Sequence, residues 1–135
     1  MIKLSKEKPY EDACKILGLR PVANYKSYKL TDETRNFIKL ETVAKALNEG
    51  WKPTTIDPKE VRYYVWGWNY TDNRKPAGLL YVDSSNGLGL ACATVGTSLE
   101  FKDRDTAKEF ARMCKPMIVK YLFGRDDHEN FKFDF

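Results

Sequence analysis

Apolar residues recur at helical spacing in three parts of the chain, and turn-forming residues bracket each part. Pro9 suits a first helical turn and Gly18 suits a left-handed stop, so a short helix is predicted over residues 9–17. Thr31 can cap a second helix that Gly50 ends. The apolar stripe of this second helix consists of Phe37, Leu40, Ala44 and Leu47, with Ile38 and Val43 beside it.

A third helix is predicted near the C-terminus. Asp103 is placed to cap its start and Gly124 to end it. Pro116 lies inside the apolar pattern, where it should kink or split the helix because it lacks a backbone donor. The apolar face consists of Ala107, Phe110, Ala111, Cys114, Ile118 and Tyr121.

Residues 61–101 have the short alternating pattern of β-strands. The Asn86-Gly87 pair is a strong hairpin signal, and strands joined by such short turns pair antiparallel. The predicted strands are an aromatic segment that ends near Asn69, then Leu79–Val82, Leu88–Val95 and Leu99–Phe101.

The predicted element order is α-α-β-β-β-β-α. We therefore expect an α+β fold, with an antiparallel four-stranded β-meander and two long helices packed mainly on one face. At 135 residues the chain is expected to form a single globular domain, 1–135. Its C-terminal tail, residues 125–135, alternates Phe131, Phe133 and Phe135 with polar residues, and we expect an edge strand or a docked tail.

The most informative stretch is Arg62-Tyr-Tyr-Val-Trp-Gly-Trp-Asn-Tyr70. A strand with a two-residue repeat places Tyr64, Trp66, Trp68 and Tyr70 on one face, and the other face is apolar too. The row is either core covered by helices or a stacking platform for bases and other planar ligands. The candidate ligand-binding residues are Arg62, Tyr64, Trp66, Trp68, Tyr70, Arg74 and Lys75.

Charge gives little further support for nucleic-acid binding. The net charge is +4, and residues 1–30 alone hold seven Lys/Arg against three acids, 7 − 3 = +4. A dedicated nucleic-acid binder usually carries a larger basic excess. Aromatic residues make up 13% of the chain, and this excess favours a partly buried or binding surface.

Other chemistry is weakly represented. Cys14, Cys92 and Cys114 are widely spaced, which favours free thiols in a reducing compartment. His128 is the only histidine, so no base accompanies a Ser or Cys nucleophile. The run Asp126-Asp127-His128-Glu129 could collect a metal ion, but a solvated charge run explains it better. We predict no catalytic residues, no metal site and no cofactor, and hence no enzyme.

Three blocks of the sequence resemble a known group of proteins. They are Leu40-Glu-Thr-Val-Ala-Lys-Ala-Leu-Asn-Glu-Gly-Trp-Lys-Pro53, Arg62-Tyr-Tyr-Val-Trp66 and Val95-Gly-Thr-Ser-Leu-Glu-Phe-Lys102. The group comprises uncharacterised small proteins of Bacteroides-type gut bacteria and their crAss-like phages. Where relatives tend to have Tyr-Tyr-Pro-Trp, this chain has Val65, so its aromatic strand is less interrupted. The resemblance implies a phage or mobile-element setting and no mechanism.

Together these observations favour a non-enzymatic, phage-type binding module that holds a nucleotide or single-stranded nucleic acid on its aromatic strand. The alternative is a protein-interaction or virion-associated structural protein, in which the same residues form a homo-oligomer interface or bind another phage or host protein. The N-terminus lacks the apolar core of a signal peptide, and no run reaches membrane-spanning length. We therefore expect no membrane partner, and a location in the cytoplasm of the bacterial host cell or in the virion.

Overall fold

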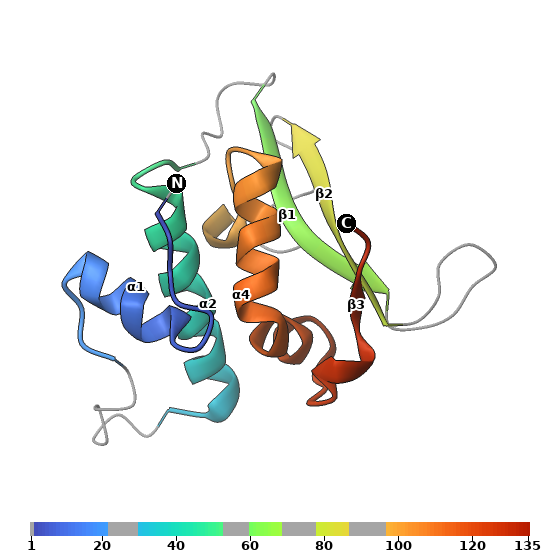
Figure 1. Cartoon of the computed structure of the whole chain (residues 1–135), viewed down its shortest axis with the longest axis horizontal. Coiled ribbons are helices and arrows are strands. Elements are labelled where there is room, and N and C mark those ends of the chain that lie inside the picture. The colour runs from blue at the N-terminus through green and yellow to red at the C-terminus, as the bar shows by residue number, and fades with distance from the viewer. Residues whose placement is uncertain (1, 22–29, 53–59, 69–77, 87–96) are drawn as a thin grey trace.

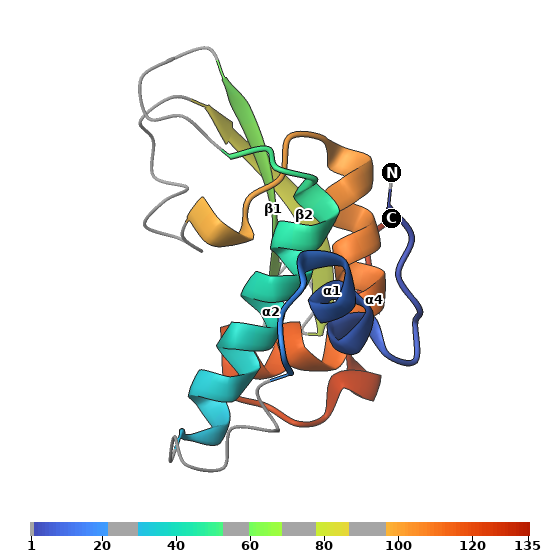
Figure 2. The ribbon, with the colours of Figure 1, turned by 90° about the vertical axis from the view of Figure 1, so that its left-hand side faces the viewer.

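The chain folds into helical layers that cover one face of a small sheet. In the described residues there are three α-helices and a three-stranded mixed sheet (Figure 1). Helix α1 packs on α2, α2 packs on α4, and α4 packs on the sheet, an order that the turned view also shows (Figure 2). The computed structural model describes residues 2–21, 30–52, 60–68, 78–86 and 97–135.

The helices begin at the residues that their capping chemistry predicts, and α1 and α4 end at the predicted Gly18 and Gly124. Helix α2 ends earlier than predicted: Glu49, and not Gly50, is its left-handed C-cap. In α2, the Thr31 hydroxyl accepts the backbone N–H of Thr34 at 3.1 Å, and in α4 the Asp103 carboxylate accepts that of Thr106 at 2.7 Å. Gly18 ends α1 in the left-handed conformation, with a φ angle of 69°. The three predicted helices are confirmed as α1 Pro9–Leu17, α2 Asp32–Asn48 and α4 Arg104–Phe123.

Helix α4 is kinked near its middle, as the position of Pro116 predicts. Cys114 has non-helical backbone angles, φ −114° and ψ 19°. Proline has no N–H to donate to the preceding turn, and its ring crowds the carbonyl four residues earlier. The kink redirects the last turns of α4, whose residue Phe123 reaches the sheet beside Gly67.

The sheet has the order β1-β2-β3. Strand β1, Val61–Trp68, pairs antiparallel with β2, Leu79–Asn86, so that Val65 lies opposite Val82 and Gly67 opposite Leu80. Strand β3, Lys132–Phe133, comes from the C-terminal tail and runs parallel to β2. On the other edge of β1, Tyr63 and Phe101 exchange two backbone hydrogen bonds of 2.9 and 2.8 Å.

The predicted four-stranded antiparallel meander is wrong. Thr97–Leu99 forms a 3₁₀ turn, and Phe101 contributes a single bridge where a strand over residues 99–101 was expected. The third strand comes instead from the distant tail, and its pairing with β2 is parallel. The expected strand over residues 88–95 lies outside the described residues.

Two further expectations about the sheet are corrected. Asp83 to Asn86 were predicted to form a turn. They instead continue the antiparallel pairing with β1, so that β2 extends to Asn86. The two long helices do not both pack on the sheet. Helix α4 lies on the sheet, and α2 packs mainly on α4 and α1, with a smaller contact to the 3₁₀ turn Thr97–Leu99.

The core lies between α4 and the face of the sheet that carries Val65 and Val82, and extends between α4 and α2. Gly67 allows the close approach of neighbouring elements to this face. A Cβ atom at Gly67 would lie 2.8 Å from the carbonyl oxygen of Leu79 and 3.0 Å from the Phe123 ring. A second apolar cluster, formed by Leu80, Val119 and Phe131, holds the tail against α4 and β2.

The cysteines that the structure describes, Cys14 and Cys114, are buried free thiols. Burial raises the pKa of the Cys114 thiol to about 12. Cys92 lies outside the described residues. Within the described part of the chain, the helices are too short or too polar to cross a lipid bilayer.

Candidate functional site

The aromatic residues of β1 lie on the face of the sheet that is turned away from α4. Val65 and Gly67 contact residues of α4, and successive strand residues alternate between faces. The β1–β2 register adds Tyr81 to the opposite row, directly across from Trp66. We call this surface the aromatic face; its described members are Tyr64, Trp66, Trp68 and Tyr81.

Exposure differs along the aromatic face. Tyr64 is buried, with 7% of its surface exposed, whereas Trp66, Trp68 and Tyr81 are each partly exposed. Trp66 also packs against the main core. The face is therefore neither wholly core nor a flat open platform, and its accessible part is centred on the two tryptophans and Tyr81.

The phenol groups of Tyr64 and Tyr81 lie near the Asp83 carboxylate, which favours their neutral form. The Tyr64 hydroxyl donates to Asp83 Oδ2 at 3.5 Å, and Oδ1 of the same carboxylate accepts the Ser84 N–H at 2.8 Å. Burial, and then the Asp83 charge, raise the pKa of Tyr64 and likewise that of Tyr81. This end of the face therefore carries the Asp83 carboxylate beside two neutral phenols.

Arg62 does not lie at the edge of a platform as the sequence suggested. Its side chain is fully buried, with Nη1 3.7 Å from Oε1 of the equally buried Glu100. The backbone carbonyl of Glu100 accepts the Asn48 side-chain amide at 3.0 Å, which ties this pair to the end of α2. Arg62 thus serves the interior and is not available to a ligand.

The remaining predicted site residues cannot be placed with the others. Tyr70, Arg74 and Lys75 lie outside the described residues. Of the seven predicted residues, the structure therefore brings Tyr64, Trp66 and Trp68 together and removes Arg62 from the surface. Tyr81 was missed, because only the register with β1 shows that it lies beside Trp66.

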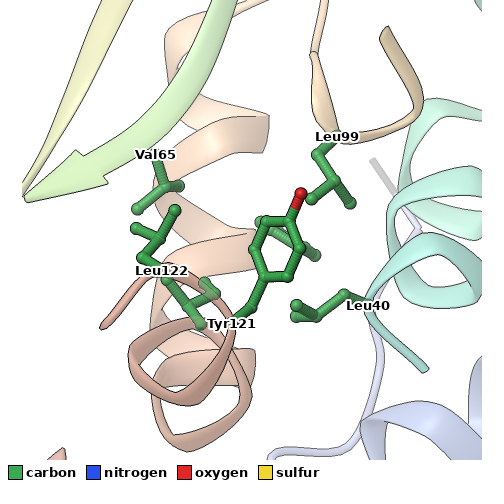
Figure 3. A pocket seen from close by; sticks show the side chains of 7 residues that line it. Leu40, Val65, Leu99, Tyr121 and Leu122 are labelled. Atoms are coloured by element: carbon green, nitrogen blue, oxygen red, sulfur yellow. The ribbon is translucent and has the colours of Figure 1, made fainter. Parts of the chain in front are cut away.

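An apolar cavity lies on the other side of β1, inside the core. The Tyr121 ring lies among Leu40, Val65, Leu99 and Leu122 around it (Figure 3). Its volume is about 10 Å³. A single water molecule needs roughly 10–15 Å³ and several polar partners, so this cavity holds no ligand and is a packing defect.

A larger pocket of about 250 Å³ opens where β2, the start of α4 and the tail meet. Neither the pocket nor its cations were predicted. The spacing of Arg104 and Lys108 places them on one face of α4. Only the fold shows that the tail closes the other side. The lining residues are Tyr81, Val82, Arg104, Lys108, Asp134 and Phe135.

The acidic run near the C-terminus is engaged with neighbouring side chains. Asp127 accepts hydrogen bonds from Arg125 Nε at 2.8 Å and Asn130 Nδ2 at 3.0 Å, and these bonds hold its pKa below the usual range. Asp126 lies 3.9 Å from the Lys120 ammonium. Across the described ranges, no group of three or more His, Cys, Asp and Glu side chains is arranged to hold a metal ion.

Comparison with protein-family models, with curated proteins and with solved structures gave no match.

Proposed function

We propose that the protein is a non-enzymatic binding module that holds a planar ligand, such as a nucleotide or single-stranded nucleic acid, on its aromatic face. The observation that carries the proposal is the partial exposure of Trp66 and Trp68 on a face away from α4, with Tyr81 beside them. Stacking of a base on an aromatic ring contributes about 1–3 kcal/mol, so two rings suffice for measurable affinity.

The strand that carries the tryptophans is fixed along both edges. Strand β2 pairs with its whole length, and the Phe101 bridge holds its other edge at Tyr63. Rings on such a strand lose little conformational freedom when a ligand binds, which favours affinity from a small contact area. The resemblance to proteins of Bacteroides-type bacteria and crAss-like phages supports a phage or host-cell setting for this module.

A second candidate function is a protein interface on the same aromatic face. Within the described strands, the charged residues on this face are Arg62, which is buried, Asp83, which would repel phosphate, and Lys132 of β3, which pairs with Leu79. Tryptophan and tyrosine dominate the energetics of protein interfaces and need no flanking cation there.

Tryptophan fluorescence tests the leading proposal. A Trp51→Phe background removes the third tryptophan and leaves the two reporters of β1. We expect saturable quenching by adenosine monophosphate and by oligothymidylate, and a roughly 5- to 150-fold weaker affinity in Trp68→Leu. Tyr121→Leu, which removes a 38% exposed ring on α4, is the matched control and should bind normally.

Folding of each variant is checked by circular dichroism, and Trp68→Tyr, which keeps a ring, should retain most of the binding. An unchanged spectrum with all nucleotides and oligonucleotides would rule out the planar-ligand proposal. Light scattering then tests the interface: a stable oligomer that dissociates in Trp68→Leu supports it, and a monomer at every concentration rejects it.

A further inference from the structure

The pocket at the open edge of β2 combines positive charge with an aromatic wall. Arg104 and Lys108 lie one turn apart on α4, and Asp134 and Phe135 of the tail line the same pocket. The pocket lies beyond the end of β3, which pairs only with Leu79 and Leu80 of β2. It is therefore a product of the tertiary fold and is distinct from the aromatic face.

Arg104 is held in position by the sheet. Its Nη1 donates to the Val82 carbonyl at 2.9 Å, and its guanidinium lies 5.1 Å from the centre of the Tyr63 ring. The Val82 bond also occupies an acceptor on the edge of β2, which disfavours the addition of a peptide strand there. The other guanidinium N–H groups have no hydrogen bond to another described residue, so they can serve an anion.

Lys108 is positioned by the tail. Its ammonium lies 5.7 Å from the centre of the Phe135 ring, and that ring stacks on Phe133 at 5.0 Å. Within the described residues, neither Lys108 nor Arg104 has a carboxylate at ion-pair distance, whereas Arg112 on the same helix pairs with Glu109 at 3.4 Å. The pocket thus holds two cations that no acid in the described part of the chain pairs with directly.

We propose that this pocket binds the phosphate groups of a nucleotide. Arginine presents several donors in a fork that matches phosphate oxygens, and a phosphate carries up to two negative charges. A doubly charged anion is attracted by both cations, and this attraction outweighs its repulsion from Asp134. A singly charged carboxylate is attracted less strongly. The volume of about 250 Å³ suits a phosphate or pyrophosphate group more than a whole drug-sized ligand.

The pocket and the aromatic face meet at one residue. Tyr81 lines the pocket and lies directly opposite Trp66 in the sheet. A nucleotide with its phosphates on Arg104 and Lys108 can extend its base past Tyr81, round the open edge of β2, toward the tryptophans on the other face of the sheet. This link rests on the proposed function, and it adds two cations to the one exposed cation, Lys132, that the described strands place on the aromatic face.

Inorganic pyrophosphate, titrated at low salt and followed by ¹H–¹⁵N NMR, tests the pocket without any base. Saturable shifts should appear at Val82, at the start of α4 and at Asp134. Arg104→Gln and Lys108→Gln should each weaken binding by about 10- to 150-fold, since a hydrogen bond to a charged group contributes about 1.5–3 kcal/mol. Asp134→Asn should strengthen it about fivefold, the value of one charge interaction in water at close range. Arg35→Gln on α2 is the charge-matched control.

Three results would overturn the pocket: no saturable shift, equal affinity in Arg104→Gln, or an equal response to acetate at the same ionic strength. The two proposals fail separately. If adenosine quenches tryptophan fluorescence but Arg104→Gln binds adenosine monophosphate normally, only the pocket fails. If pyrophosphate binds normally to Trp68→Leu while adenosine never quenches, only the aromatic-face proposal fails.

Discussion

Replacing Glu100 by glutamine should destabilise the protein by about 3–5 kcal/mol, because it removes the buried carboxylate that lies 3.7 Å from the Arg62 guanidinium. Both side chains are fully buried, and their charged atoms are 3.7 Å apart. At that distance and an effective dielectric of about 20, the attraction is about 4.5 kcal/mol. Desolvation of two buried ions costs several kcal/mol each, so the intact pair contributes little net stability while a broken pair is strongly unfavourable.

The assay is urea unfolding followed by circular dichroism, on four proteins of one double-mutant cycle. Glu100→Gln and Arg62→Met should each lose about 3–5 kcal/mol, a large share of the 5–15 kcal/mol typical of a domain. The double variant Arg62→Met/Glu100→Leu should lose far less than their sum. Glu41→Gln, an exposed acid on α2, is the control and should change stability by less than about 0.5 kcal/mol.

Two outcomes would refute this reasoning about the pair. If Glu100→Gln is as stable as the natural sequence, the pair is hydrated and the arginine is not confined to the interior. If the losses in the cycle add fully, the two side chains act independently. The first outcome would also return Arg62 to the list of cations that a ligand on the aromatic face could use.

The other stability predictions concern a helix cap and a close approach. Asp103→Ala should lose about 0.5–2 kcal/mol at pH 7. Burial opposes ionisation of Asp103, but its bonds to Thr106 prevail and lower its folded-state pKa, so the stabilisation is present above the ordinary aspartate pKa. Unfolding curves from pH 7 to 2 should show the difference shrinking as pH falls through the lowered pKa; a constant difference contradicts this. Gly67→Ala should lose about 1–3 kcal/mol in urea unfolding, because its Cβ would approach the Leu79 carbonyl oxygen to 2.8 Å; a gain in stability would refute the contact.

Local chemistry made the helices predictable. Each helix start is decided by groups within a few residues, as in the bonds of Thr31 to Thr34 and of Asp103 to Thr106. The same holds for the kink at Pro116, which depends on one missing donor. The alternation of the aromatic strand placed Tyr64, Trp66 and Trp68 on one face for an equally local reason.

Distant contacts made the sheet and the charged residues unpredictable. The third strand is Lys132–Phe133. The alternation of the tail predicted an edge strand or a docked tail, but nothing in residues 61–101 signals that the tail pairs with β2, or that the pairing is parallel. From the sequence alone, Arg62 is expected to be an exposed cation. In the structure, the bridge between Tyr63 and Phe101 places Glu100 beside it in the interior. The pocket likewise depends on the tail lying against Lys108, a contact that helix periodicity alone does not contain.

The central claim, that Trp66 and Trp68 hold a planar ligand, is tested most directly by ¹⁹F NMR of protein labelled with 5-fluorotryptophan. Single Trp→Phe variants assign the three resonances, and adenosine monophosphate is then added. The account predicts saturable shifts of the Trp66 and Trp68 resonances, caused by the ring current of the stacked base, and an unchanged Trp51 resonance after the end of α2. Three unchanged resonances, or a shift confined to Trp51, would contradict it.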